Sequence, residues 1–282
     1  MIDWPEQLID DLKNKRVVLF LGSGVSNNAV GLDGQRRPKT WRNFLHNAAE
    51  RHHALDEISS YLDVNDFLTA LDLLKNKISR DDYARLIYEE YIEPRYGEAP
   101  IHEEIYKLDA KIVLTPNFDK IYDLYSGSKS RGTVVIKNYY DADLPRFIRG
   151  DKQVVIKIHG SSDSVEQMIF GRKDYALART KYKSFYEMLK SLILTHTFLF
   201  IGCGTDDPDI RMLLEDIQFS AVNAREHYFL SAQGSIKIGF KTVLETTMNL
   251  KVLEYDYDPQ QRDHSDLTNS LRELNLILPW NV

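Results

Sequence analysis

Cysteine is almost absent from this sequence: Cys203 is the only one in 282 residues. A single cysteine excludes an intramolecular disulfide and any zinc site built from several cysteines, and it fits a reducing compartment. No apolar run approaches the roughly 20 residues that span a bilayer. The N-terminus, with Trp4, Pro5 and the acidic pair Asp10 and Asp11, has neither the basic start nor the apolar core of a signal peptide. We therefore expect a cytoplasmic protein with no membrane contact.

Clustered positive charge is also lacking. The formal net charge is −6 at pH 7, and nucleic-acid binding needs grouped Lys and Arg to contact phosphates. The short basic group Arg36, Arg37 and Lys39 is typical of a solvated loop. We expect no direct nucleic-acid binding. Apolar residues make up 43% and charged residues 28%, which is typical of a soluble globular protein.

Short apolar runs rich in β-branched residues recur along the chain and end at glycine or small polar residues. They are Val17–Leu21, Ile112–Leu114, Val154–Ile158 and Phe198–Ile201, with two later runs at Tyr228–Leu230 and Val252–Tyr255. Uninterrupted apolar runs are typical of strands buried on both faces of a parallel sheet. Helical patterns lie between them, so the sequence predicts an α/β fold with a Rossmann-like parallel sheet.

One stretch departs from this alternation. From about Trp41 to Leu108 the apolar spacing is helical throughout, as in Phe67, Leu71 and Leu74. This stretch is too long for one crossover helix. We therefore expect a single domain spanning 1–282, with a helical subdomain inserted at about 41–108.

Two glycine loops follow predicted strands. Gly22, Ser23, Gly24 and Ser26 come after the run that ends at Leu21, and Gly202, Gly204 and Thr205 come after the run that ends at Ile201. Glycines at such positions let the backbone turn tightly and approach a phosphate. The third glycine and the later acid of the dehydrogenase fingerprint are missing. A tight turn with no ligand explains either loop taken alone.

Two other strand ends carry polar side chains. Asn117 and Asp119 follow the run at Ile112–Leu114, and His159 follows the run at Val154–Ile158. Asn117 can donate and accept hydrogen bonds, and a histidine can act as a general base near neutral pH. Taken alone, helix capping explains the first pair better, and a structural role explains the histidine. Because ligands of open parallel sheets bind at the carboxyl ends of the strands, the shared placement of all four motifs indicates one site.

The order of these motifs, Gly-Ser-Gly-Val-Ser, Pro-Asn-Phe-Asp, Ile-His-Gly and Gly-x-Gly-Thr, resembles the sirtuin superfamily, and most closely the sirtuin-like domains of bacterial antiphage defence proteins. The resemblance implies that NAD is the substrate. It implies that Asn117 and His159 are catalytic, and that Asp119 lies near the nicotinamide. By the same resemblance the cofactor-binding residues are Gly22, Ser23, Gly24, Ser26, Asp119, Gly202, Gly204 and Thr205.

The departures from deacylase-type sirtuins are informative. Their four-cysteine zinc module has no counterpart, since only about forty residues separate His159 from Gly202 and none is cysteine. We expect no metal. Pro116 stands where deacylases carry Gln, and Arg172 replaces the acid after Phe170-Gly171 in the stretch that clamps acyl-lysine.

The leading hypothesis is therefore a NAD glycohydrolase that releases nicotinamide and ADP-ribose, acting as a NAD-depleting effector in antiphage defence. A protein deacylase or ADP-ribosyltransferase using the same pocket is one alternative, and a non-enzymatic NAD or ADP-ribose sensor is another. An unrestrained NAD hydrolase would harm its host, so regulation is expected. The resemblance implies a homo-oligomer with a separate partner, such as a HerA-like ATPase or an argonaute, because little room for a fused sensor follows Val252.

Overall fold

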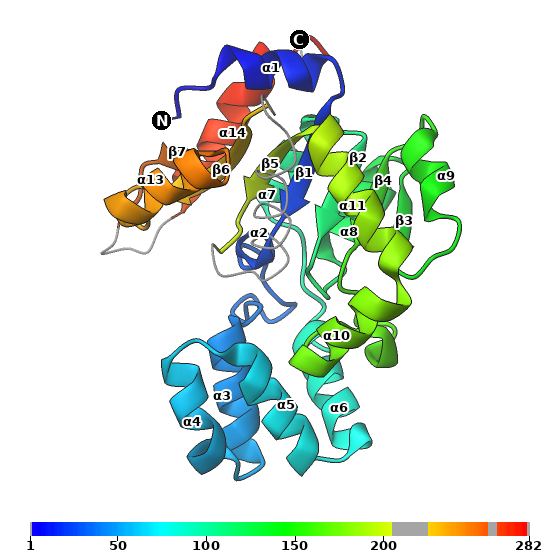
Figure 1. Ribbon diagram of the computed structural model, residues 1–282, viewed down its shortest axis with the longest axis vertical. Helices are drawn as coiled ribbons and strands as arrows, with labels where there is room; N and C mark the ends of the chain where they lie inside the picture. Colours follow the sequence, from blue (N-terminus) through cyan, green and yellow to red (C-terminus); the bar gives the residue numbers. More distant parts are fainter. Residues whose placement is uncertain (1, 205–224, 259–263, 281–282) are drawn as a thin grey trace.

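The computed structural model describes residues 2–204, 225–258 and 264–280. Its centre is a seven-stranded sheet in the order β3-β4-β2-β1-β5-β6-β7, and every pairing between neighbours is parallel (Figure 1). The predicted α/β fold with a Rossmann-like parallel sheet is confirmed. The strands are β1 (Val17–Leu21), β2 (Ile112–Thr115), β3 (Val135–Asn138), β4 (Val154–Lys157), β5 (Thr197–Ile201), β6 (His227–Ala232) and β7 (Leu250–Tyr255).

Strand β3 was not among the predicted strands. It is short, lies at the edge of the sheet and is only partly buried, so it lacks the long apolar run that marks the others. The signal was the β-branched group Val134, Val135 and Ile136 after Gly132. The structure therefore adds an edge strand that pairs with β4.

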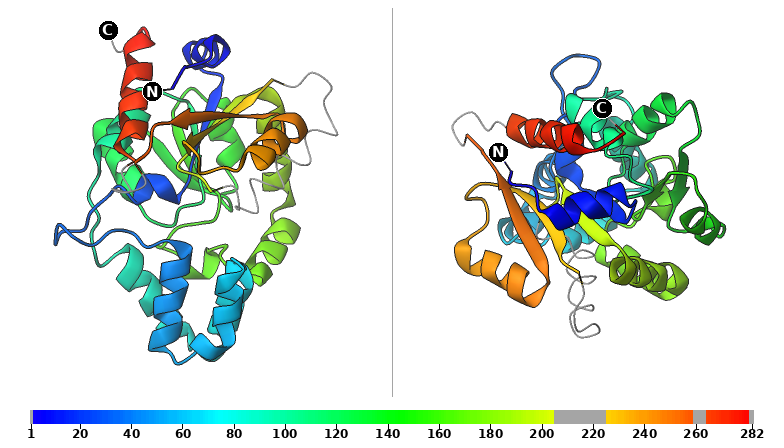
Figure 2. Two further views of the ribbon diagram at one scale, coloured as in Figure 1. Left: turned by 90° about the vertical axis from the view of Figure 1, so that its left-hand side faces the viewer. Right: turned by 90° about the horizontal axis from the view of Figure 1, so that it is seen from above.

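Helices cover both faces of the sheet, which explains why its strands are apolar without alternation. Within β1, Val17, Leu19 and Leu21 pack into one core, while Val18 and Phe20 pack into the other. The first core contains α1 (Glu6–Lys13), α7 (Pro100–Lys107), α8 (Ile121–Lys129) and α14 (Ser265–Ile277). The second contains α9 (Leu144–Arg149), α10 (Arg172–Lys181), α11 (Lys183–Thr195) and α13 (Ile238–Thr247) (Figure 2).

A third core lies away from the sheet, beyond the carboxyl ends of the strands (Figure 1). Three of its helices begin at a side chain that accepts a backbone N–H of the first turn, namely Thr40, Asp66 and Ser79, which is the stabilising arrangement for a helix start. Its helices are α3 (Trp41–Arg51), α4 (Leu55–Asp63), α5 (Phe67–Lys77) and α6 (Arg80–Tyr91).

The helical core is joined to the sheet by residues from two strand-end loops. Phe118 follows β2, and Met168 and Phe170 follow β4, yet all three are buried among α3–α6. The Phe118 and Phe170 rings lie 4.7 Å apart, and Trp41 meets Phe170 edge-on at 4.5 Å. Strand ends and helical core therefore form one packed unit at the carboxyl edge of the sheet. In the described part of the chain, no helix is both long enough and apolar enough to cross a membrane.

Candidate functional site

The loop after β1 packs backbone to backbone against the loop after β5. Gly22 N–H donates to the Ile201 carbonyl at 2.9 Å, and Gly24 N–H donates to the Gly202 carbonyl at 2.8 Å. A Cβ on Gly22 would lie 2.4 Å from the Gly202 oxygen, and Gly202 itself has a φ of +63°. Glycine is required at these positions because of the neighbouring loop, a reason that the sequence alone did not show. The turn continues into the short helix α2 (Ser23–Ser26).

Asn117 is held rigidly in the loop after β2. Its Nδ2 donates to the Gly22 carbonyl at 2.9 Å and to Ser26 Oγ at 3.0 Å, so both amide hydrogens are used. Its own backbone N–H donates to Thr115 Oγ1 at 3.1 Å. The amide oxygen, Oδ1, is therefore the end of the side chain that can accept a hydrogen bond from a ligand.

A buried hydrogen-bond chain continues from Asn117. Ser26 Oγ accepts from Asn117 and donates to Asp119 Oδ2 at 2.7 Å. Asp119 Oδ1 accepts the N–H of Ile121, the first residue of α8, at 3.1 Å, although Lys120 and not Asp119 occupies the N-cap position of that helix. Three of the predicted site residues thus form one continuous network.

Lys157, which was not predicted as a site residue, contacts this network through Asp119. Its Nζ donates to the Asp119 carbonyl and pairs with Asp123 at 3.1 Å, and both side chains are almost fully buried. Burial raises the pKa of the Asp123 carboxyl, against the opposing effect of Lys157. A lysine in an otherwise apolar strand is the sequence signal that could have identified it.

His159 lies directly after β4 and is 2% exposed. Its Nε2 forms a hydrogen bond with the Tyr175 hydroxyl at 3.2 Å, and its carbonyl accepts the N–H of Ile169 at 2.9 Å. The Phe118 ring lies 6.5 Å from the imidazole, centroid to centroid. Gly160 has a φ of +81°, and a Cβ there would meet the Gln167 carbonyl at 2.7 Å. The imidazole is thus fixed by α10 on one side and by the Phe118 loop on the other.

All four motifs meet in one pocket of about 80 Å³. The predicted residues that line it are Gly22, Ser23, Ser26, Asn117, Asp119, His159 and Gly204. Sequence reasoning did not predict that Pro38, Lys39, Trp41 and Tyr91 would complete the wall. These four come from the helical core and from the segment that leads into it, so helices α3 and α6 cover the pocket.

A larger groove of about 1030 Å³ adjoins the pocket. The two share Ser23, Cys203 and Gly204, and the groove also contains the predicted residues Gly24 and Gly202. It extends over the carboxyl ends of β6 and β7. Its described lining holds Arg37, Arg272 and His264 and no carboxylate, so its electrostatic character suits an anionic ligand.

Of the predicted site residues, Thr205 lies outside the described residues. Within the described ranges, no group of three or more His, Cys, Asp and Glu side chains is placed to hold a metal ion.

Comparisons with known proteins bear out the resemblance to the sirtuin superfamily. The family model described as SIR2-like domain matches residues 111–253. The chain is 26% identical over 223 residues to NAD(+) hydrolase ThsA of Enterococcus faecium, covering 77% of this chain and 43% of that protein. It is 22% identical to NAD(+) hydrolase ThsA of Acinetobacter baumannii (strain 532279), covering 98% of this chain and 53% of that protein.

A third relative is Defense-associated sirtuin 2 of Bacillus subtilis, at 23% identity over 76% of this chain and 20% of that protein. The chain thus spans about half, or less, of the length of these curated relatives. A solved structure described as "Structural Basis for the Mechanism and Regulation of Sir2 Enzymes" matches 98% of this chain and 97% of its own, with a TM-score of 0.48 and 12% identity. Since the family model covers half of the sequence, including the strand ends that carry Asn117 and His159, the chain belongs to the SIR2-like domain family.

Proposed function

We propose that this protein is a NAD glycohydrolase, which cleaves NAD to nicotinamide and ADP-ribose. The observation that carries the proposal is the convergence of Asn117, His159 and the two glycine loops in one pocket, beside a groove whose described lining holds no carboxylate. The names of two relatives, both NAD(+) hydrolase ThsA, support the same activity. Because the substrate is consumed, NAD acts here as a reactant and not as a resident cofactor.

The two cavities suit the two halves of NAD. The pocket would take the nicotinamide ribose, and the adjoining groove would take the adenosine half. The diphosphate would then lie at the residues that both share, Ser23, Cys203 and Gly204. Arg37 and Arg272 on the groove favour a ligand with negative charge. In this arrangement Gly22, Ser23, Gly24, Ser26, Gly202, Gly204 and Thr205 bind the dinucleotide, and Asp119 lies near the nicotinamide end.

The chemistry assigns a separate task to each catalytic residue. The bond between ribose C1′ and the nicotinamide nitrogen breaks, and its electron pair leaves with nicotinamide, which departs neutral because it was cationic before cleavage. Water then bonds to C1′ and loses a proton to His159, which acts as general base. Asn117, whose amide hydrogens are both used by Gly22 and Ser26, accepts through Oδ1 a hydrogen bond from the water or a ribose hydroxyl.

The stretch that resembles the acyl-lysine clamp favours hydrolysis over deacylation. Phe170 is fully buried in the helical core. Arg172 Nε donates to Thr69 Oγ1 at 2.6 Å, and its Nη2 pairs with Asp66 at 2.7 Å. This segment therefore packs against the start of α5, with Phe170 held inside the helical core.

The first test follows nicotinamide release from NAD by the purified protein. Asn117→Ala and His159→Ala should each lower kcat by at least about 100-fold, the size usual for a general base or an orienting group. His46→Ala, on the exposed face of α3, should leave the rate unchanged. Full turnover by both pocket variants would refute these assignments.

The alternative functions give different results in the same assay. Acceleration of NAD consumption by an acetylated peptide would favour deacylation, and labelled protein would favour ADP-ribosyl transfer. Tight binding of NAD without turnover would favour a sensor.

The biological setting is also a proposal. We infer a cytoplasmic NAD-depleting effector in antiphage defence, built as one domain over 1–282 with the helical subdomain at about 41–108. We further infer a homo-oligomer that responds to a separate partner, such as a HerA-like ATPase or an argonaute. Light scattering coupled to size-exclusion chromatography tests the oligomer directly, and a monomer at micromolar concentration would count against it.

A further inference from the structure

A short segment forms part of the wall of the pocket. We define it as the strap, residues 30–40, which leads from α2 to α3. Pro38 and Lys39 of the strap line the pocket, next to Trp41 at the start of α3. The position of the strap therefore decides whether the pocket has this wall.

The tip of the strap is folded on itself. Asp33 Oδ1 accepts the backbone N–H groups of Gln35 and Arg36 at 2.9 and 2.8 Å, and the Arg36 carbonyl accepts the N–H of Gly31 at 2.8 Å. The same backbone N–H groups hold the pKa of Asp33 below its usual value. The strap thus behaves as a formed turn rather than as a loose loop, and a contact at one point of it positions its neighbours.

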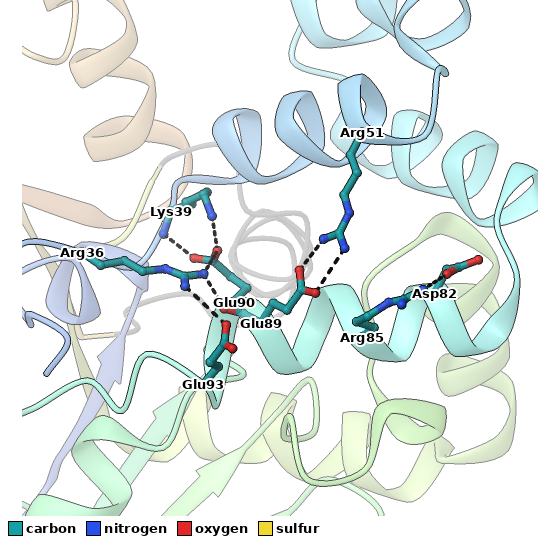
Figure 3. Close-up of polar contacts among 8 residues, drawn as sticks. All are labelled: Arg36, Lys39, Arg51, Asp82, Arg85, Glu89, Glu90 and Glu93. Atoms are coloured by element: carbon teal, nitrogen blue, oxygen red, sulfur yellow. Dashed lines mark hydrogen bonds and ion pairs between the residues drawn. The ribbon is translucent and has the colours of Figure 1, made fainter. Parts of the chain in front are cut away.

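Glu90, near the end of α6, is the point to which the pocket side of the strap is attached. Its side chain is 2% exposed. It accepts the backbone N–H of Lys39 at 2.8 Å and pairs with the Lys39 ammonium at 2.5 Å and with the Arg36 guanidinium at 3.6 Å (Figure 3). A carboxylate so deeply buried requires such partners, and both of these cations belong to the strap.

Glu89, the preceding residue, has a different partner. Its carboxylate pairs with Arg51 of α3, outside the strap (Figure 3). Only its backbone carbonyl accepts from Arg36, and a side-chain substitution leaves that carbonyl in place. The two adjacent glutamates therefore provide a matched pair: the Glu90 side chain bonds directly to the strap, whereas the Glu89 side chain bonds directly to Arg51.

The far half of the strap is held separately. The Val30 carbonyl accepts the N–H of Gly97 at 2.9 Å, and Leu32 N–H donates to the Pro94 carbonyl at 3.0 Å. These backbone bonds do not depend on Glu90. Arg36 also pairs with Glu93 at 3.8 Å, and the Arg37 guanidinium donates to the Asn27 and Asn28 carbonyls at 3.1 and 3.0 Å. Loss of the Glu90 carboxylate should therefore release Lys39, which lines the pocket, while the rest of the strap stays attached.

We propose that Glu90 is a positioning residue for NAD binding: it holds Lys39 so that the strap forms the pocket wall. This role for Glu90 rests on the NAD glycohydrolase activity proposed above. When a binding-competent form is populated only in part, the apparent affinity falls by that fraction. Loosening the strap should therefore raise KM, while kcat at saturating NAD stays nearly unchanged, because bound substrate selects the closed strap.

Trypsin cleavage tests the attachment without any enzyme activity. The bonds after Arg36 and Lys39 are potential cleavage sites within the strap. Glu90→Gln keeps the size of the side chain and an acceptor for the Lys39 N–H, but it removes the ionic attraction. We expect Glu90→Gln to be cut in the strap at least about fivefold faster than wild type, and Glu89→Gln to be cut at the wild-type rate. Equal rates for all three proteins would overturn the proposal.

Kinetics test the consequence for substrate. Glu90→Gln should raise KM for NAD about tenfold and keep kcat within about twofold. Glu90→Asp, which keeps the charge on a shorter side chain, should restore part of the loss, and Glu89→Gln should match wild type. Faster strap cleavage with an unchanged KM would show that Glu90 holds the strap but does not position the pocket, which would overturn its role in NAD binding.

Failure of the proposed function would be recognised separately. If the wild-type protein does not turn over NAD, ADP-ribose becomes the probe, and it should protect the wild-type strap from trypsin more strongly than the Glu90→Gln strap. Equal protection, or none, would overturn the role of Glu90.

If Glu90→Gln does not fold, Glu90→Asp serves in its place, with an expected KM increase of about threefold. An unchanged KM and unchanged cleavage would contradict the proposal.

Discussion

Ser26 links the two side chains that the site depends on. Its hydroxyl accepts from Asn117 at 3.0 Å in a part-buried contact and donates to Asp119 at 2.7 Å in a buried one. Without it, one Asn117 amide hydrogen and one Asp119 oxygen lose their partners. The orientation of the Asn117 amide, and with it the direction of Oδ1, therefore depends on the last residue of α2.

Ser26→Ala should lower kcat/KM for NAD about tenfold, because loss of one buried hydrogen bond costs roughly 1–2 kcal/mol. Steady-state nicotinamide release measures the effect. Ser126→Ala is the matched control, since Ser126 is also buried but its hydroxyl donates to the Asp123 carbonyl within α8. Equal losses in the two variants would mean that Ser26 acts through general stability and not through Asn117.

At the scale of elements, the loops after β1 and β5 behave as one unit. Their glycines place the Gly22, Gly24 and Gly202 backbones in direct contact. A side chain at any of these three positions would collide with the neighbouring loop, and Gly202 also has a positive φ, which glycine adopts without strain. These glycines would be required for folding even if no ligand were bound.

Gly22→Ala should destabilise the protein by about 2 kcal/mol or more, since its Cβ would lie 2.4 Å from a backbone oxygen. Gly127→Ala should instead stabilise it by about 0.5–1 kcal/mol, because Gly127 lies inside α8 and a Cβ there meets nothing within 4 Å. Urea unfolding of both variants gives the comparison. A stable Gly22→Ala protein would show that the two loops can separate.

The strands themselves could be predicted, because a strand buried on both faces is apolar at every position. The runs at Val17–Leu21 and Val154–Ile158 coincide with β1 and β4 to within one residue. The edge strand β3 was not predicted because none of its residues is fully buried, so it lacks a continuous apolar run. The structure places Asn117, His159 and the glycine loops at strand ends, while their roles in catalysis stay predictions.

At the scale of the whole molecule, acid stability depends on buried histidines. Burial lowers the pKa of His227 from 6.5 to about 4, and burial also lowers the pKa of His102 and His196. Between pH 6.5 and about pH 4, His227 binds a proton in the unfolded chain but not in the folded protein. The contribution of His227 to the free energy of unfolding is therefore fully present above pH 6.5 and is lost as the pH drops towards 4.

His227→Asn should remove about 3 kcal/mol of this pH dependence between pH 6.5 and 4, the amount that corresponds to the shift in pKa. The Asn oxygen can still accept the Phe198 N–H that His227 Nδ1 accepts at 3.1 Å. Asp123, with its raised pKa, has the opposite sign, so the difference between variant and wild type isolates His227. Urea titrations at several pH values between neutral and acid measure it, with exposed His46→Asn as control; an unchanged slope in His227→Asn would contradict the assignment.

Local order along the chain was enough to determine the parallel sheet, the long helical stretch and the four strand ends, since each depends on the spacing of apolar residues or on one short motif. Contacts between distant segments were decided only by the tertiary structure. Tyr91 and Lys39 reach the pocket because α3–α6 pack at the carboxyl edge of the sheet. Likewise, Asn117 presents its oxygen because Gly22 and Ser26, 95 and 91 residues away, accept both of its amide hydrogens. Such pairings depend on packing in three dimensions, and no periodicity in the sequence encodes them.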